Sequence, residues 1–116
     1  MKIDSYRFGF IVINGKTYTK DLKIIEGKIK ENWWRSTGHV CTVEDIRDII
    51  DTRPHTLILG TGASGLMKPA PGLSEELAQS GIRLESIPTE LAAMRYNELC
   101  SMVGEDKVAL AAHLTC

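Results

Sequence analysis

The sequence predicts an α/β fold in which an N-terminal antiparallel β-meander joins a three-stranded parallel αβαβαβ core. The first observation is the alternation of apolar and polar residues over positions 5–34, which is typical of strands. The second is a change of period after Gly38, where helical segments begin to alternate with short apolar strands. The third is the length of 116 residues with 43% hydrophobic content, which suits one domain over residues 1–116 with its own core.

The predicted meander begins with a strand that places apolar side chains on one face: Tyr6, Phe8, Phe10 and Val12. Asn14-Gly15 follows, and Asn-Gly between apolar alternations is a strong hairpin signal because both turn residues need a positive φ. The next strand carries Leu22 and Ile24 and turns at Glu26-Gly27. A third short strand then runs from Lys28 to Trp33.

The α/β half begins with a helix that Thr42 and Asp45 cap, in the manner of a capping box with Asp in place of Glu. Its apolar face consists of Val43, Ile46, Ile49 and Ile50. Pro54 ends this helix. Residues 57–59 are apolar on both faces, as expected for a covered parallel strand.

Two more helix–strand pairs follow. A short helix over about 73–80 ends at Gly81, and residues 82–87 form a strand. A longer helix over 89–103 leads to the last apolar strand, 108–112. The order predicts three parallel strands joined by right-handed crossovers, with the meander extending or covering their sheet.

Gly60, Gly62 and Gly65 follow the 57–59 strand with the spacing of a dinucleotide-binding fingerprint. That fingerprint requires a helix whose N-terminus binds the pyrophosphate, but Pro69 and Pro71 occupy the place of the helix. We therefore predict no nicotinamide or flavin cofactor.

The same loop still leaves the carboxyl end of a parallel strand, where open α/β sheets place their ligands. Its N–H groups would form an anion nest without a helix, with Thr61 and Ser64 beside them and Lys68 adding positive charge. The alternative is a strand-exit turn in which the glycines only provide positive φ angles.

Arg95 projects into the apolar stripe of the 89–103 helix, which consists of Leu91, Ala92, Tyr96, Leu99, Met102 and Val103. Because helical side chains lean toward the N-terminus, we expect Arg95 to reach the 60–68 loop. The alternative is an ion pair with Glu85 or Glu90, since a charge on a buried face needs a partner.

Trp33 and Trp34 are adjacent, so in a strand they point to opposite faces. One is expected in the core, and the other, beside Arg35, is a candidate anchor for a binding partner.

Two segments pair a histidine with a thiol, namely His39-Val-Cys41 and His113-Leu-Thr-Cys116. Their spacing does not match a zinc ribbon, so we predict no metal site. A Cys–His nucleophile needs a third orienting group, which the sequence does not show, so we predict no catalytic residue. We interpret His113 as a polar residue hydrogen-bonded near the end of a buried strand.

The formal net charge of -1 argues against nucleic-acid and anionic-membrane binding. No apolar run approaches the roughly 20 residues of a membrane span, and the N-terminal residues do not form a signal peptide. An odd number of widely spaced cysteines, three in all, favours reduced thiols and a cytoplasmic location.

Several segments together resemble the Mth-type domain of unknown function: Trp33-Trp34-Arg35 with Gly38-His39, Arg53-Pro54, the Gly60–Met67 segment, Arg95-Tyr96-Asn97 and the final His113-Leu-Thr-Cys116. Relatives in that family include an adipogenesis-associated protein and a mitochondrial assembly factor for respiratory complex I. The resemblance covers essentially the whole chain. It implies a compact β/α domain with a Rossmann-like α/β half and provides no catalytic residue or cofactor.

Two functional hypotheses follow. The first is a non-enzymatic binding or assembly module that contacts a protein partner through the Gly60–Gly65 loop and its surroundings. The alternative is a small-molecule-binding protein or enzyme for an anionic or nucleotide-like ligand, held by the loop and Arg95. The candidate binding residues are Gly60, Thr61, Gly62, Ser64, Gly65, Lys68, Arg95, Asn97 and Trp34.

Overall fold

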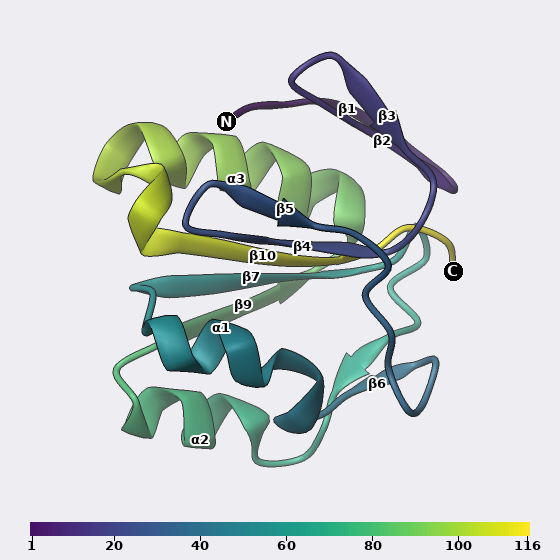
Figure 1. Cartoon of the computed structure of the whole chain (residues 1–116). Helices are drawn as coiled ribbons and strands as arrows, with labels where there is room; N and C mark the ends of the chain where they lie inside the picture. The colour runs from purple at the N-terminus through teal and green to yellow at the C-terminus, as the bar shows by residue number, and fades with distance from the viewer.

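The computed structural model describes residues 1–116 and consists of a central five-stranded sheet with helices on both faces (Figure 1). In Figure 1 the helix α3 lies on one side of the sheet, and α1 and α2 lie on the other. The helices are α1 (Arg47–Thr52), α2 (Leu73–Gln79) and α3 (Thr89–Val103), with 3₁₀ turns at Glu44–Ile46 and Glu105–Lys107.

The central sheet has the strand order β5-β4-β10-β7-β9. Its strands are β4 (Leu22–Ile25), β5 (Lys28–Lys30), β7 (Thr56–Thr61), β9 (Arg83–Ile87) and β10 (Val108–His113). β7 pairs in parallel with both β9 and β10, which confirms the predicted three-stranded parallel core. β4 is antiparallel to β10 and β5 to β4.

The predicted meander divides between two sheets. Its second hairpin extends the central sheet, whereas the first three strands, β1 (Ile3–Arg7), β2 (Phe10–Ile13) and β3 (Lys16–Tyr18), form a separate sheet. Both expected turns are present, because Asn14-Gly15 and Glu26-Gly27 all have φ between 49° and 80°. A two-stranded ladder joins β6 (Val40–Cys41) to β8 (Lys68–Pro69).

The predicted apolar face of the first strand was wrong, because the chain reverses earlier than expected. Gly9, with φ of 80°, lies in a turn between β1 and β2. This turn leaves Phe8 and Phe10 exposed and directs Ile11 and Ile13 into the core. The third predicted strand also ends early, at Lys30, so Trp33 and Trp34 lie outside any strand.

Two apolar clusters cover the two faces of the central sheet, and the alternation of β7 and β10 separates them. Ile58 faces the cluster under α3 and the small sheet, while Leu57 and Leu59 face the cluster under α1 and α2. β10 alternates in the same way, with Leu110 on the first side and Ala111 on the second. The buried strands therefore follow the period of two that strands require.

The buried stripe of α3 differs from the predicted one. Its buried residues are Thr89, Ala92, Ala93, Tyr96 and Leu99. Leu91 and Met102, which the sequence placed in the stripe, are 53% and 69% exposed. The stripe is therefore rotated away from Arg95, whose side chain lies at its margin and is about one-third exposed.

Asn97, one of the candidate binding residues, uses its side-chain amide to attach the small sheet to α3. Its Oδ1 accepts a hydrogen bond from the backbone N–H of Ile3 at 2.9 Å, and its Nδ2 donates to the carbonyl of Ile3 at 2.8 Å. Ile3 is buried, so these two backbone groups depend on the Asn97 amide for partners.

We expect Asn97→Ala to lower the free energy of unfolding by about 2 kcal/mol, because it leaves a buried donor and acceptor of Ile3 unpaired. The measurement is urea denaturation followed by circular dichroism. Ser101→Ala, an exposed position one turn further along α3, is the control and should change stability by less than about 0.5 kcal/mol. Equal midpoints for both variants would contradict the assigned role of Asn97.

Candidate functional site

The Gly-rich loop leaves the carboxyl end of β7, beside the carboxyl end of β10. Thr61 pairs with His113 in the parallel register, so the two strands end at the same edge of the sheet. In Figure 1 the C-terminus and the β1–β2 turn lie at this same edge. The predicted position of the loop is therefore correct.

Five N–H groups of the loop, from Gly62 to Met67 with the exception of Ser64, are already bonded within the chain, which overturns the prediction of a free anion nest. Two of them bond to the residues after β10: Ala63 donates to the carbonyl of Thr115 at 2.6 Å, and Leu66 to that of Cys116 at 3.1 Å. Others bond to nearby groups: Gly62 to Thr89 Oγ1 at 2.8 Å, Gly65 to the Gly62 carbonyl at 3.3 Å and Met67 to the Thr61 carbonyl at 3.1 Å.

Close packing explains two of the glycines. Gly62 has φ of 101°, and a Cβ there would lie 2.6 Å from the carbonyl carbon of Cys116. A Cβ on Gly60 would lie 3.0 Å from Thr89 Oγ1, at the start of α3. The loop glycines thus allow the C-terminal residues and the α3 N-terminus to approach the backbone closely.

The remaining loop candidates have different surroundings. Thr61 is buried at the end of β7, whereas the side chains of Ser64 and Lys68 are exposed. Lys68 belongs to β8, where its N–H donates to the carbonyl of His39 at 2.9 Å. The three candidates therefore differ in environment, with one buried and two exposed side chains.

Arg95 does not reach the loop, so that expectation was wrong. Its guanidinium bonds Glu85 in β9, with Nε–Oε1 and Nη2–Oε2 distances of 2.8 and 3.2 Å, and also bonds Glu98. The hydrogen bond to Glu85 raises the pKa of Arg95. Glu85 pairs with Ile58 in the middle of the sheet, which keeps Arg95 away from the carboxyl edge.

Trp33 and Trp34 have the opposite environments that the sequence predicted. Trp33 is 7% exposed, and its indole Nε1 donates to the carbonyl of Asp45 at 2.8 Å. Trp34 is 79% exposed and borders a surface hollow that Lys20 and Thr115 also line.

The structure reveals a polar cluster that sequence reasoning missed, centred on the carboxylate of Asp21. Asp21 Oδ2 accepts from Arg35 Nη2 at 2.9 Å and lies 2.8 Å from His113 Nδ1. Asp21 Oδ1 accepts from the N–H of Leu114 at 2.8 Å. Asp21 and His113 are 92 residues apart, so no local pattern could have joined them. The hydrogen-bonded role expected for His113 is present, with Asp21 as its partner.

Arg35 and His113 are both largely buried, with 5% and 8% of their side chains exposed. The guanidinium stacks on Trp33 at 4.5 Å from the ring centroid, while Arg35 Nε and Nη1 have no hydrogen-bond partner. Burial alone would raise the pKa of Asp21, but hydrogen bonds from His113, Leu114 and Arg35 outweigh it and hold the pKa below its ordinary value.

Cys41 is fully buried under α1 and α2, and burial raises the pKa of its thiol to about 12. A thiol of this kind is not a ready nucleophile, because the thiolate is the reactive form.

No helix of the chain has the length and apolar character needed to span a bilayer.

These features define an α/β domain with a mixed five-stranded sheet and a carboxyl edge closed by its own last residues. The family model described as "Protein of unknown function (DUF498/DUF598)" matches residues 3–113. The chain therefore belongs to this family.

Solved structures show the same fold. The conserved hypothetical protein PH1505 from Pyrococcus horikoshii OT3 is 24% identical, with full coverage of both chains and a TM-score of 0.77. MT938 is 24% identical over 99% of this chain and 98% of its own, with a TM-score of 0.79. A Bordetella pertussis protein described as a Mth938-like domain is 19% identical over 97% of this chain and 85% of its own, with a TM-score of 0.74. The resemblance to the Mth-type domain is confirmed.

We expect Gly62→Ala to destabilise the fold by about 1–3 kcal/mol, because the new Cβ adds backbone strain and a clash with Cys116. Gly72→Ala is the matched control, since Gly72 also has a positive φ but has open space around its Cβ position. The difference between their urea midpoints isolates the contact with Cys116. No difference would contradict that contact.

We expect Asp21→Ala to lower the free energy of unfolding by about 3–5 kcal/mol at neutral pH, because it leaves the buried guanidinium of Arg35 without its carboxylate. Folding lowers the pKa of Asp21. The ionised carboxylate therefore stabilises the fold above its unfolded pKa of about 3.9, and this stabilisation is lost as the pH falls through the folded pKa. Urea denaturation from pH 7 to pH 2.5 should show the gap between wild type and variant narrowing below about pH 4. A gap that stays constant or widens on acidification would contradict this role.

Proposed function

We propose that the protein is a non-enzymatic binding module that contacts a partner protein through its carboxyl-edge surface. We define this surface by three exposed side chains around residues 114–116: Phe8, Trp34 and Leu66. They are 61%, 79% and 52% exposed. Large apolar side chains exposed around one short segment are a feature of surfaces that contact other proteins.

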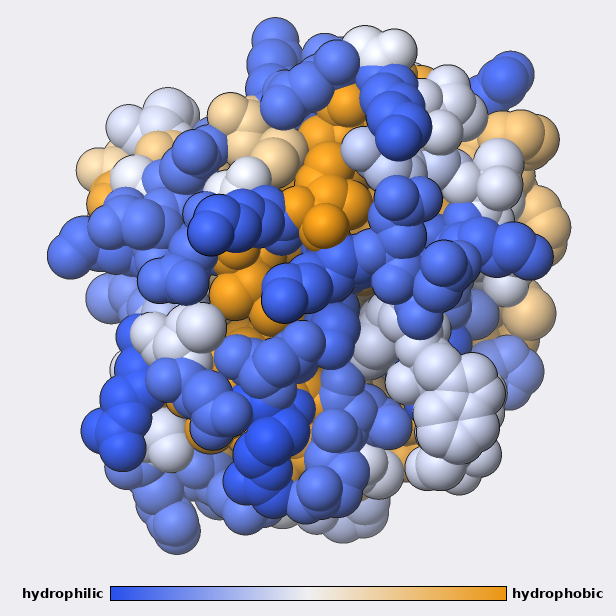
Figure 2. All heavy atoms as spheres, in the orientation of Figure 1, coloured by the Kyte–Doolittle hydropathy of each residue, from blue (hydrophilic) through white to orange (hydrophobic).

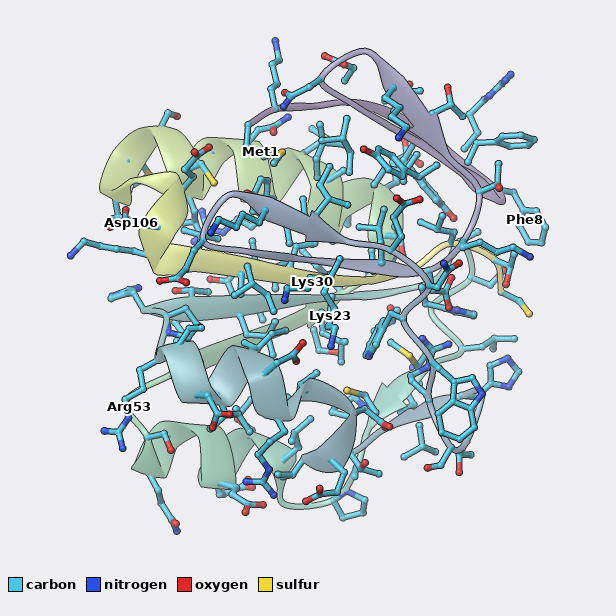
Figure 3. All side chains as sticks on the ribbon, in the orientation of Figure 1. Met1, Phe8, Lys23, Lys30, Arg53 and Asp106 are labelled. Atoms are coloured by element: carbon cyan, nitrogen blue, oxygen red, sulfur yellow. The ribbon has the colours of Figure 1, made fainter.

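Two main-chain hydrogen bonds and one shared hollow place these three residues beside the segment 114–116. Gly9, next to Phe8, donates its N–H to the Leu114 carbonyl at 2.7 Å, and Leu66 donates to the Cys116 carbonyl at 3.1 Å. Trp34 shares a hollow with Thr115. Figure 2 shows light-orange, apolar atoms along the right margin, where Figure 3 labels Phe8 pointing outward.

The single observation that carries the proposal is the state of the Gly-rich loop. The N–H groups of Gly62, Ala63, Gly65, Leu66 and Met67 bond to the chain itself, while the side chain of Leu66 faces solvent. A small anion would have to displace the carbonyls of Thr115 and Cys116, and Arg95 is engaged with Glu85. The contacts therefore favour the partner-binding hypothesis over the anionic-ligand hypothesis.

The charges beside the surface indicate the chemistry of the partner. Arg7 precedes Phe8, Lys20 lines the hollow at Trp34, and Lys68 follows the loop; all three are exposed. An apolar contact flanked by acidic residues would complement this arrangement. We further propose a cytoplasmic location, which the three free cysteines support.

We expect the double variant Phe8→Glu with Leu66→Glu to lose its partner, because charges replace the apolar contact. The loss should reach about 2 kcal/mol, or about 30-fold in affinity. The measurement is quantitative affinity capture under reducing conditions, followed by titration of the captured protein against the purified variants.

Met102→Glu is the matched control, because Met102 is 69% exposed but lies at the opposite end of α3. It should bind like wild type, and all variants should keep the wild-type unfolding midpoint within the error of the measurement. Equal binding by the double variant and Met102→Glu would refute the carboxyl-edge surface as the contact.

A further inference from the structure

The carboxyl edge of the sheet brings together two histidines and a cysteine from segments far apart in the sequence. His39 precedes β6, His113 is the last residue of β10, and Cys116 lies three residues beyond it. One ligand atom from each lies within 4.8 Å of the other two. Cys116 Sγ lies 3.7 Å from His39 Nε2, and the two imidazole rings meet edge to face with centroids 6.0 Å apart.

The orientation of His113 is an independent indication of a ligand. Its Nδ1 lies 2.8 Å from the Asp21 carboxylate and 3.1 Å from Arg35 Nη2. Because Nη2 already donates to Asp21 and to the carbonyl of Gly38, Nδ1 carries the proton and donates it to Asp21. Nε2 is then the nitrogen with the free lone pair, and it is buried without a hydrogen-bond partner. A carboxylate that fixes the tautomer of a histidine is the usual outer contact of a metal-binding imidazole.

The distances are compatible with one small ion. Bond lengths of about 2.3 Å to sulfur and 2.0–2.1 Å to nitrogen place tetrahedral ligand atoms about 3.4–3.6 Å apart. The Sγ–Nε2 distance of 3.7 Å is close to that value, and the 4.8 Å limit leaves at most a modest side-chain adjustment. His39 is exposed, so its ring is free to make such an adjustment.

The donor set selects the class of metal. Two imidazoles and a thiolate suit Zn²⁺ and related borderline ions, whereas Mg²⁺ and Ca²⁺ prefer oxygen ligands. Asp21 balances the charge of Arg35, so the thiolate of Cys116 would supply the negative charge for the ion. Cys41, which the sequence placed beside His39, is enclosed in the core under α1 and α2 and takes no part.

We propose that His39, His113 and Cys116 bind one divalent ion of the zinc class, with a fourth position open to water and with Asp21 orienting His113. Three protein ligands and one open position differ from a closed structural site, which uses four. The site goes beyond the proposed partner contact and does not depend on it.

The test uses the full chain, reduced and stripped with a chelator, and Co²⁺ as a spectroscopic probe for Zn²⁺. We expect one Co²⁺ per chain, with a thiolate-to-cobalt charge-transfer band that one equivalent of Zn²⁺ removes. Cys116→Ser should abolish the band. His39→Ala should weaken Co²⁺ binding at least 10-fold, and neither variant should perturb the fold, because neither side chain belongs to the core.

Cys100→Ser and His55→Ala are the matched controls, since both residues lie outside the cluster. Both should bind Co²⁺ like wild type. The proposal is overturned if wild type shows no charge-transfer band, if the band survives in Cys116→Ser, if Cys100→Ser removes it, or if His39→Ala binds with wild-type affinity.

Discussion

The carboxylate of Asp21 is the interaction on which the carboxyl edge of the fold depends. It lies just before β4 and accepts hydrogen bonds from three groups: the Leu114 N–H, the guanidinium of Arg35 and the imidazole of His113. It thereby fixes the residues after β10 and the segment after Trp33. Because the residues after β10 in turn bind the Gly-rich loop and the β1–β2 turn, one carboxylate supports the whole edge.

The glycines have a packing role that complements this anchor. Their missing side chains make room for backbone that approaches from two sides: the Thr89 end of α3 and the carbonyls of Thr115 and Cys116. The loop has the glycine spacing of a phosphate-binding loop, but carbonyl groups of the chain itself accept most of its N–H groups. The same close approach leaves Leu66 facing solvent and brings Cys116 next to His39.

Much of the fold could be predicted because its signals are local. The apolar run at β7, the glycine after α2 and the apolar run at β10 each mark an element within a few residues. The Phe8-Gly9 turn could not be predicted, because its flanking residues continue the alternation of a single strand. Local alternation does not reveal where a chain reverses when the turn itself has apolar residues.

The site was less accessible to sequence reasoning than the fold. The edge and the loop were located correctly, because parallel strands share their carboxyl ends. The partner of Arg95 and the cluster around Asp21 depend on the exact rotation of α3 and on contacts across more than 90 residues. Charge and residue type identified these side chains as polar groups in need of partners, but only the packed structure determines the partners.

The carbonyls of Leu114, Thr115 and Cys116 have a consequence for how this edge opens. They accept the N–H groups of Gly9, Ala63 and Leu66, which belong to the β1–β2 turn and to the Gly-rich loop. Lifting this one segment exposes all three amides together, so hydrogen exchange at the turn and at the loop belongs to a single cooperative opening. The edge would thus fluctuate as one unit, separately from the buried strands β7 and β10 beneath it.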